Sequence, residues 1–449
     1  MRHWRNPSYI DGCHLSGLKM SVVIPLPYTP DLIVHYQSLA HLPGFALLES
    51  RDLLRGRYDI VTAYPYDQIQ EGFSHGFFQR LQERLGHAAS FSPLPFQGGA
   101  IGYLSYDFGA TSVGIHKEPH SCNDLPLVSV GFYDWAIVTD HQKRCVHLLA
   151  ANTKKETPSI VEEICVRWEK ARAEPLVFSI IEPFKSLITK KDYQQGFAAI
   201  HEALRQGRAY QVNYTQPFLA RYQGDSWELY RRVRASNLVP FGGFLSLETA
   251  SILSFSPERF FSMAEGVIET SPIKGTAKRD SDPGLDKQLQ EDLRNSVKDR
   301  AENVMIVDLL RNDLSKLAHP GSVQVLALCE LQSFQAVHHL VSTITATSDA
   351  TPFAVLEACF PGGSITGAPK REAMRIIAEQ EPFARGLYCG SIFYASRHGR
   401  FDSNIAIRTV IAGSDSLYLA AGGGLMIDSQ CEAEYQECFI KLEGIMKAL

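Results

Sequence analysis

The sequence predicts an α+β fold, in which antiparallel strands and helices mix without regular alternation. Residues 251–274 have the pattern of a β-hairpin around a turn at Glu265-Gly266. Residues 388–395, 401–411 and 416–421 have the pattern of three successive strands. Hydrophobic residues make up 45% of the 449 residues and charged residues 21%, which is ordinary globular composition and excludes a largely disordered chain.

The first part of the chain mixes strand and helix patterns. We expect strands within 45–50, 58–65, 100–108 and 127–140, and helices within 75–86 and 158–173. Residues 1–19 have no periodicity and no apolar stretch of a signal peptide, so we expect a loose N-terminal extension, or an upstream start codon ahead of Met20. Residues 175–184 join this part to the second half.

The second half has sharper boundaries. Thr189 and Asp192 have the spacing of a capping box, which opens a helix that ends at Gly207, and an alternating strand follows at 209–222. A long helix is expected over 284–317 and strands over 322–347. Pro369 begins a helix that ends before Pro382, and a capping box at Ser429 and Glu432 opens the last helix.

Charge and cysteine content exclude several classes of function. Lys+Arg number 44 and Asp+Glu 49, a net charge of −5, so no basic surplus supports nucleic-acid binding. Nine cysteines without C-x-x-C spacing argue against a disulfide framework or a structural zinc site and favour the cytoplasm. No apolar run is long enough to span a bilayer, so no membrane segment is expected.

A lysine stands at the end of an apolar hairpin strand, in the sequence Pro272-Ile273-Lys274-Gly275-Thr276. A register centred on the Glu265-Gly266 turn places Glu258 within one position of Lys274. A carboxylate and an amine that close could exchange a proton. The alternative is a surface lysine with an incidental salt bridge.

Two helices carry paired carboxylates. Asp299 and Glu302 are spaced i, i+3, and so are Glu434 and Glu437, which puts each pair on one helix face. Facing helices with such pairs would suit a hard divalent ion such as Mg²⁺. Two solvated acidic faces are the alternative.

Glycine-rich segments and one arginine are further candidates. Residues 361–370 precede a helix, and Gly422, Gly423 and Gly424 would let backbone approach a ligand closely. Arg408 lies opposite two isoleucines and could bind a carboxylate. Turns and a surface ion pair are the alternatives. In the adjacent pair His338-His339, alternation sends the two rings to opposite faces, where one could serve as an acid or base. A structural role for each is the alternative.

Together these segments resemble the chorismate-utilising enzymes, which include anthranilate, aminodeoxychorismate, isochorismate and salicylate synthases. The resemblance is dense from about residue 210 to the C-terminus. It is carried by AYQVNYTQPF, SFSPERFF, SPIKGTAKR, DRAENVMIVDLLRNDL, VHHLVSTI, PGGSITGAPKREAM, RGLYCGSIFY, NIAIRT and GGGLMIDSQCEAEYQE. It implies two packed antiparallel sheets with helices outside in one two-lobed domain. The N-terminal subdomain would span 20–180 and the chorismate-binding region 181–449.

Residue types within the family indicate the reaction. Gln211 stands where the water-adding enzymes have a lysine base, so hydroxyl transfer is disfavoured. Lys274 stands where anthranilate synthases have alanine. A lysine at this position is similar to the branch of the family that forms 4-amino-4-deoxychorismate on the route to 4-aminobenzoate and folate. The resemblance implies a covalent role for Lys274 and proton transfer by Glu258.

The resemblance also implies the remaining site. His339, rather than His338, would lie near the departing hydroxyl. Glu302 and Glu437 would hold Mg²⁺, with Asp299 and Glu434 as alternate or supporting ligands. The substrate would be bound by Gln211, Gly275, Thr276, Thr366, Tyr388, Arg408, Gly422, Gly423 and Gly424.

Partners follow from what the chain lacks. No G-x-C-x-G nucleophile motif is present, so ammonia is expected from a separate glutamine amidotransferase subunit in a heterodimer. Residues 47–50 resemble part of a tryptophan site, in which Ser50 would be joined by Pro240 and Phe241. The rival readings are anthranilate synthase component I and a non-catalytic binding protein on the same fold.

Overall fold

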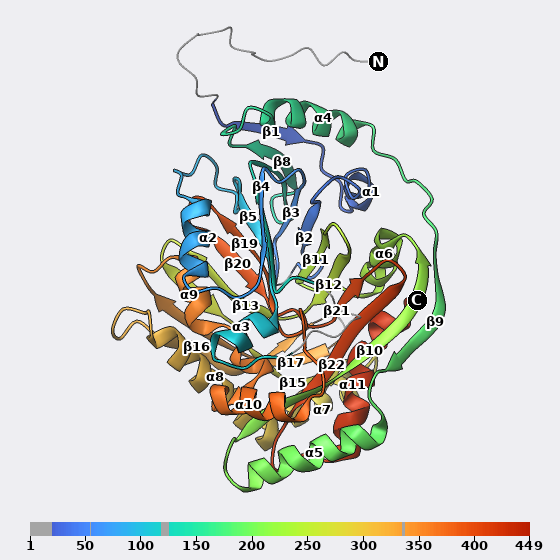
Figure 1. The fold of residues 1–449 in the computed structure, drawn as a ribbon, viewed down its shortest axis with the longest axis vertical. Helices are drawn as coiled ribbons and strands as arrows, with labels where there is room; N and C mark the ends of the chain where they lie inside the picture. Colours follow the sequence, from blue (N-terminus) through green and yellow to red (C-terminus); the bar gives the residue numbers. More distant parts are fainter. Residues whose placement is uncertain (1–19, 54, 118–124, 335–336) are drawn as a thin grey trace.

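Two antiparallel sheets pack face to face with helices on their outer faces, in a computed structural model that describes residues 20–53, 55–117, 125–334 and 337–449 (Figure 1). The α+β architecture that the sequence and its family resemblance imply is therefore confirmed. The expected extension at 1–19 lies outside the described residues. Both sheets contain strands from each half of the chain.

The larger sheet has the order β1-β8-β7-β3-β2-β11-β12-β21-β22-β10-β18, and β9 pairs with β10 outside this path. Its strands are β1 (Val22–Leu26), β2 (Ala46–Glu49), β3 (Tyr58–Thr62), β7 (Trp135–Asp140), β8 (Cys145–Ala150), β9 (Phe178–Ser186), β10 (Gln211–Gly224), β11 (Phe241–Ser246), β12 (Ser251–Ser256), β18 (Gly367–Ala368), β21 (Thr409–Ala412) and β22 (Ser416–Leu425).

The smaller sheet has the order β15-β17-β14-β13-β20-β19-β5-β6-β4, and β16 pairs with β17 outside this path. Its strands are β4 (Asp67–Glu71), β5 (Gly99–Leu104), β6 (Val128–Tyr133), β13 (Arg259–Ala264), β14 (Val267–Thr270), β15 (Ile273–Lys278), β16 (Gln324–Ser333), β17 (Val337–Thr347), β19 (Ser391–Ser396) and β20 (Phe401–Asn404).

Helices cover the outer faces of both sheets, as Figure 1 shows for α2, α8 and α9 on one side and α6 and α11 on the other. Their bounds are α1 (Ile33–Gln37), α2 (Phe77–Leu85), α3 (Tyr106–Ser112), α4 (Thr157–Glu169), α5 (Lys190–Arg205), α6 (Ser226–Ser236), α7 (Pro283–Asn295), α8 (Val297–Ser315), α9 (Pro352–Cys359), the short 3₁₀ turn η1 (Gly363–Ile365), α10 (Lys370–Gln380) and α11 (Cys431–Met446).

Three layers of apolar side chains hold these elements together. One lies between the larger sheet and helices that include α4, α5, α6 and α11. A second lies between the smaller sheet and helices that include α2, α8 and α9. The third lies between the sheets and contains Ile60, Ile101, Val138, Ile252 and Ile392. Removing this apolar surface from water is the main drive that joins the sheets.

Several local signals predict the elements correctly. Thr189 and Asp192 form the expected capping box at the start of α5, and Gly207 adopts the left-handed conformation just beyond its end. The hairpin register is also correct, since Ala264 pairs with Val267 across the Glu265-Gly266 turn and Ser262 pairs with Glu269.

Three predicted single strands are wrong, because in each case the chain crosses from one sheet to the other. The run 127–140 divides at Asp134 into β6 and β7, and the run 251–263 divides at Pro257-Glu258 into β12 and β13. The run 401–411 divides at 405–408 into β20 and β21. Strand-forming residues resume directly after each crossing because both sheets bury side chains, so the pattern does not reveal that the chain has changed sheet.

Three other boundary predictions need correction. The expected strand over 100–108 ends at Leu104, and Ser105 caps α3 instead. The expected long helix over 284–317 is two helices, since Ser296 leaves the helical conformation and caps α8. Ser429 does not cap α11; its hydroxyl donates to the Glu434 carboxylate at 2.7 Å.

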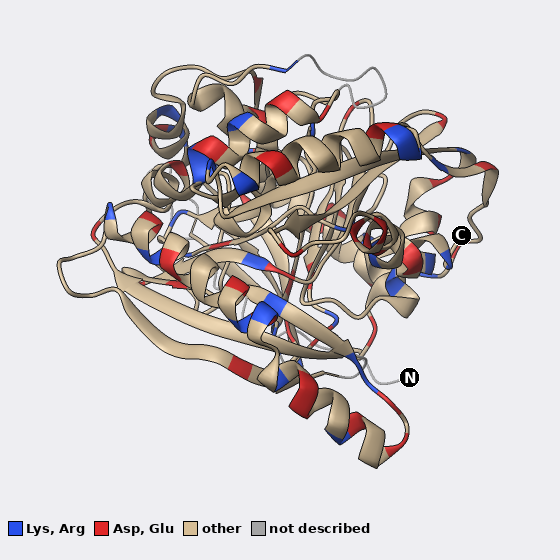
Figure 2. Ribbon diagram, turned by 90° about the horizontal axis from the view of Figure 1, so that it is seen from below, with Lys and Arg blue, Asp and Glu red and all other residues tan. Residues whose placement is uncertain are grey.

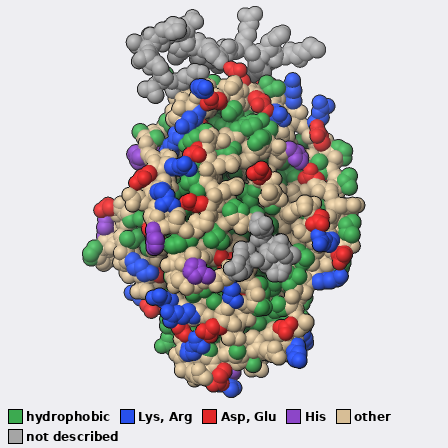
Figure 3. All heavy atoms as spheres, in the orientation of Figure 1, with side chains coloured by type: hydrophobic (Ala, Val, Ile, Leu, Met, Phe, Trp, Pro, Cys, Tyr) green, Lys and Arg blue, Asp and Glu red, His purple; other side chains and the backbone are tan. Residues whose placement is uncertain are grey.

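The surface carries charges of both signs in alternation. Figure 2 shows acidic and basic positions interspersed along the helices, and Figure 3 shows the same mixture on one face of the molecule. Within the described ranges, no helix is long and apolar enough to cross a membrane.

Candidate active site

Lys274 lies on β15 with its amine held by oxygen atoms. Its Nζ donates to Glu302 Oε1 at 3.1 Å and to the Ser364 carbonyl oxygen at 3.3 Å. Only 15% of the Lys274 side chain and 13% of the Glu302 side chain are exposed. A lysine that is largely buried needs such partners, so this is not a solvated surface lysine.

Glu258 lies at the crossing between β12 and β13 and is buried. Its carboxylate accepts a hydrogen bond from the Ser364 side chain and faces the charge of Lys274. Burial raises the pKa of Glu258, and the nearby Lys274 charge opposes this rise. A carboxyl group with a raised pKa is suited to carrying a proton.

Glu258 and Lys274 are thus close in space, as predicted. The strand pairing that was predicted to bring them together is wrong. The β13–β14 hairpin ends at Thr270, and Lys274 instead pairs across β17 with Leu340. Glu258 comes close to Lys274 because the chain leaves the larger sheet at this point. Ser364, from η1, contacts both.

Three of the four predicted helix carboxylates approach β22. An added Cβ at Gly424 would lie 3.1 Å from Glu302 Oε1, and one at Gly423 would lie 2.9 Å from Glu434 Oε2 and 3.7 Å from Glu437 Oε1. Helices α8 and α11 therefore direct glutamates at the same stretch of backbone. The Asp299 carboxylate instead accepts from Ser296 Oγ at the start of α8, and its side chain lies beside Gly275.

These glutamates fit a hard divalent cation by their chemistry, since Mg²⁺ prefers carboxylate oxygens together with water and substrate oxygens. The pKa of Glu434 is raised by burial and by the neighbouring Glu437, so negative charge is crowded here. Two lysines neutralise part of it: Lys274 pairs with Glu302, and Lys441 pairs with Glu437 at 2.7 Å. In this conformation no three metal-ligating side chains of the described chain lie close enough to hold an ion.

The two adjacent histidines have different surroundings, as strand alternation predicts. His338 is fully buried and bonds to Asp286 at 2.9 Å and to Ser333 at 2.8 Å, as a structural histidine does. His339 lies beside Lys274's strand, with Nδ1 2.8 Å from the Thr276 hydroxyl. Burial, together with the charges of Arg55 and Arg408, lowers the pKa of His339 to about 4.

Arg408 is an uncompensated cation at the crossing between β20 and β21. Its backbone is in the left-handed region, with φ of 49°, which is uncommon for a residue with a side chain. Burial lowers the pKa of Arg408. No hydrogen bond or ion pair to its side chain occurs among the described residues. Such a guanidinium is available to an incoming carboxylate.

Gln211 is fully buried on β10, and neither atom of its side-chain amide has a hydrogen-bond partner within the described part of the chain. Its Nε2 would lie 2.0 Å from a Cβ added at Gly424, so the amide points at the glutamate cluster. Orphaned buried amides are costly, which suggests that a ligand completes this one.

The other predicted substrate contacts have structural partners. The Thr366 hydroxyl donates to the Gly362 carbonyl at 3.0 Å and thereby ties down the glycine-rich loop. Tyr388 packs in the apolar core of the smaller sheet, beside Cys389 and Arg385. Gly275 forms a bulge in β15 with φ of 81° and packs against Asp299.

The residues expected at a tryptophan site also come together. Ser50, Pro240 and Phe241 line a cavity of about 280 Å³ next to β2 and β11. Arg55 lines it as well and extends toward His339.

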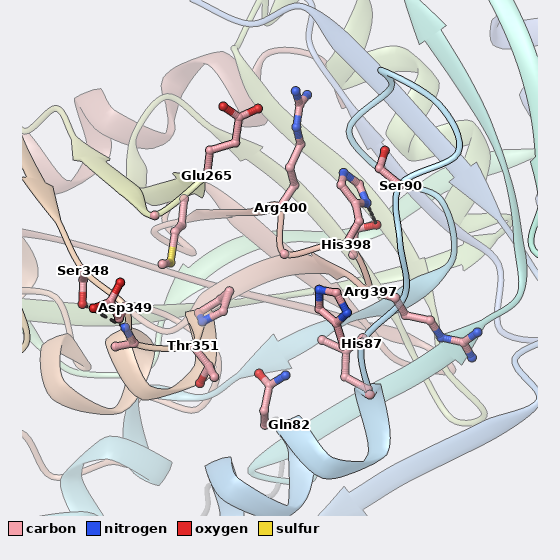
Figure 4. Close-up of a pocket in the computed structure, with 18 of the residues that line it drawn as sticks. Gln82, His87, Ser90, Glu265, Ser348, Asp349, Thr351, Arg397, His398 and Arg400 are labelled. Atoms are coloured by element: carbon pink, nitrogen blue, oxygen red, sulfur yellow. Dashed lines mark hydrogen bonds between the residues drawn. The ribbon is translucent and has the colours of Figure 1, made fainter.

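A wider hollow lies elsewhere, near the Glu265-Gly266 turn and the C-terminal end of α2. Its volume is about 760 Å³, and Figure 4 shows it bordered by His87, His398, Arg400 and Asp349. None of the predicted catalytic residues lines it. The volume of a cavity therefore does not locate the candidate site in this molecule. The site is located by the paired and unpaired polar side chains that lie around Lys274.

Three contacts were missed from the sequence. Ser364 belongs to the glycine-rich motif but has no distinctive spacing. Lys441 lies four residues after Glu437, which is the spacing of an ordinary helical ion pair. Arg55 has no periodic signal at all, since only the folded chain brings it near Glu258 and His339.

This chain is similar to known proteins in sequence and in structure. Residues 45–447 match the family described as chorismate binding enzyme. Aminodeoxychorismate synthase component 1 of Salmonella typhimurium is 41% identical over 95% of this chain and 98% of its own length, and that of Escherichia coli is also 41% identical, with the same shares covered. The crystal structure of anthranilate synthase component I from Streptococcus pneumoniae superposes with a TM-score of 0.76 at 29% identity, over 87% of this chain and 92% of the other.

Proposed function

This chain belongs to the chorismate-binding enzyme family, and we propose that it converts chorismate and ammonia to 4-amino-4-deoxychorismate on the route to 4-aminobenzoate and folate. It is a chorismate-utilising enzyme whose similar relatives include aminodeoxychorismate synthase component 1 of two bacteria, at 41% identity. The resemblance stated from the motifs is confirmed at this level.

The observation that carries the proposal is the position of Lys274. Its amine lies 3.1 Å from Glu302 and beside Glu258, in the part of the molecule that contains Arg408, His339 and the Gly422–Gly424 backbone. A nucleophilic amine needs a base nearby, because at neutral pH an ordinary lysine is almost entirely protonated.

The proposed reaction has two displacements. The Lys274 amine gives a proton to Glu258 and attacks C2 of chorismate, while the two conjugated ring double bonds shift and the C4 hydroxyl leaves with a proton returned by Glu258. Ammonia then attacks C4, the two double bonds shift back and the Lys274–C2 bond breaks. The sum is chorismate plus ammonia giving 4-amino-4-deoxychorismate plus water, with the lysine regenerated.

The remaining residues bind and orient the substrate in this proposal. Arg408 and the backbone of Gly422–Gly424 hold the enolpyruvyl carboxylate, and the backbone at Gly275-Thr276 holds the ring carboxylate. His339 lies near the departing hydroxyl in its neutral form, which its lowered pKa supports. Mg²⁺ held by Glu302, with Glu434 or Glu437, would neutralise the ring carboxylate of the substrate.

A second protein supplies the ammonia in this proposal. The relatives bear the name component 1, which implies a partner component. We infer a glutamine amidotransferase subunit in a heterodimer, working in the cytoplasm. The isolated chain should use ammonium but not glutamine; glutamine-dependent turnover by this chain alone would contradict the inferred partner.

Product analysis tests the proposed reaction most directly. The purified chain is incubated with chorismate, Mg²⁺ and ammonium, and the product is identified by mass spectrometry and chromatography. We expect 4-amino-4-deoxychorismate, whereas anthranilate would identify the rival reaction. Absence of any turnover with a folded protein would favour a non-catalytic binding protein.

Variants test the assignment of Lys274 and Glu302. Lys274→Ala should abolish the 4-amino product, while Lys278→Ala, at the exposed end of the same strand, should retain it. Undiminished turnover in Lys274→Ala would end the covalent mechanism. Glu302→Gln should lose the Mg²⁺ dependence of chorismate binding, and an unchanged dependence would remove Glu302 from the ligands.

Tryptophan is proposed as a second ligand, in the cavity lined by Ser50, Pro240 and Phe241. Calorimetric titration of tryptophan decides this proposal. Heat of binding that disappears in a Ser50→Trp variant, which fills the cavity, would support it; no heat with the unaltered protein would contradict it.

A further inference from the structure

Two lysines occupy the glutamate cluster that the proposed function assigns to Mg²⁺. Lys274 is paired with Glu302, and Lys441 is paired with Glu437 while also donating to the Gly422 carbonyl at 2.8 Å. The nucleophile of the proposed reaction is thus bound to one of the carboxylates that the reaction also needs for the metal.

We propose that Lys274 and the divalent cation compete for Glu302, so that Lys274 is released toward Glu258 only when the cation binds. The inference rests on the proposed function, because it takes Lys274 as the nucleophile and Glu302 as a metal ligand. It goes further by making the two roles mutually exclusive at one carboxylate.

The geometry at Glu302 supports exclusion rather than sharing. The oxygen that accepts from Lys274 is Oε1, and this same oxygen lies 3.1 Å from the Cβ position of Gly424, the residue next to Gly423, where Glu434 and Glu437 lie. A magnesium ligand contacts the ion at about 2.1 Å, so a single oxygen there would be shared by two cations of the same sign. Their repulsion at such short range is strong in a partly desolvated site.

Lys274 has a second acceptor to which it can move. Glu258 already interacts with the Lys274 charge, and Ser364 contacts both residues, through its carbonyl oxygen for Lys274 and its side chain for Glu258. A small change of the lysine rotamer therefore exchanges one carboxylate for the other without exposing the amine. The charge of Lys274 opposes the cost of burying the Glu258 carboxylate.

The three glutamates also explain why positive charge is needed beside them in the metal-free protein. Glu302, Glu434 and Glu437 converge on Gly423 and Gly424, and close carboxylates repel one another. Lys274 and Lys441 compensate for this repulsion in the resting protein. The nucleophile is then held inactive, as an ammonium bound to Glu302, until the site is loaded.

Metal affinity without turnover tests the proposal. Mg²⁺ is titrated by calorimetry, at one fixed pH, into the unaltered chain, Lys274→Met, Lys274→Arg and the control Lys278→Met. Removing a competing ion pair of about 1 kcal/mol should tighten Mg²⁺ binding of Lys274→Met by about fivefold. Lys274→Arg keeps a competing cation and should gain no affinity, and Lys278→Met corrects for the loss of one general positive charge.

Chemical labelling of the unaltered protein gives a second measurement that needs no variant. The rate at which an amine-specific acylating reagent modifies Lys274, followed by peptide mass spectrometry, should rise several-fold when Mg²⁺ is added. Lys278 in the same peptide mixture should label at an unchanged rate.

Equal Mg²⁺ affinity in the unaltered protein and Lys274→Met would overturn the proposal, and so would Lys274 labelling that is indifferent to Mg²⁺. The second result stands even where a variant fails to fold. Both measurements are independent of the product formed, so a finding of anthranilate would refute the proposed function without touching the competition.

Discussion

Arg408 offers a prediction in which activity and stability move in opposite directions. The substitution is Arg408→Met, which removes the charge but keeps an unbranched side chain. Its guanidinium has no hydrogen bond or ion pair within the described residues, and burial lowers its pKa, so the folded protein carries an uncompensated charge.

The magnitudes follow from these two features. A guanidinium–carboxylate pair that forms only with substrate contributes roughly 2–3 kcal/mol, so its loss should lower kcat/KM about 30- to 150-fold. Relief of a partly buried charge should stabilise the substrate-free protein by about 1 kcal/mol, which is a rise of a few degrees at most in Tm for a chain of this size. The positive φ of 49° is unchanged in Arg408→Met, so backbone strain does not enter the comparison.

Steady-state kinetics with chorismate and thermal unfolding without ligand measure the two effects. Arg408→Lys is the matched control, since it keeps the charge, loses the forked geometry and should not gain stability. The reasoning is refuted if Arg408→Met lowers Tm while kcat/KM is unchanged, because the guanidinium would then have a structural partner instead of a substrate.

Three further predictions concern neighbouring residues. Ser364→Ala should lower kcat about tenfold and move the acidic limb of its pH profile to higher pH, because the Ser364 hydrogen bond lowers the pKa of Glu258. Ser364→Thr should restore both the rate and the profile. An unshifted pH profile in Ser364→Ala would count against this role. His339 is held neutral in the folded protein, with a pKa of about 4 against 6.5 for an ordinary histidine, so the unfolded chain binds more protons between these values. The free energy of unfolding should therefore fall as pH falls through this window. Between pH 7 and pH 4.5, His339→Gln should lose up to about 3 kcal/mol less stability than the unaltered protein, as urea unfolding would show. Gly424→Ala places a Cβ 2.0 Å from Gln211 Nε2 and should cut turnover more than tenfold, while Gly413→Ala, whose Cβ meets nothing closer than 3.4 Å, should retain it.

Local signals predicted much of the fold because they depend on neighbours in the chain. The Thr189–Asp192 capping box, the hairpin register at Ala264 and Val267, and the separation of His338 from His339 all follow from spacing within a few residues. The ordered motifs then predicted the family, which the comparisons confirm.

The crossings between the sheets could not be predicted in this way. Asp134, Pro257-Glu258 and 405–408 are short interruptions in runs of strand-forming residues, and either sheet would bury the side chains before and after each interruption. Two of these crossings carry Glu258 and Arg408, so the irregular backbone that the pattern missed is the backbone that positions the site.

The sequence by itself determined which chemical groups this protein has, since motif and spacing are properties of one chain read in order. Only the tertiary structure decided which groups meet. Lys274 shares Glu302 with the glutamate cluster, Ser364 joins it to Glu258, and Lys441 neutralises Glu437, although these residues come from β15, α8, η1 and α11. These contacts are set by the packing of two sheets and their helices, which minimises the exposed apolar surface of the whole molecule. A local sequence pattern does not contain this information.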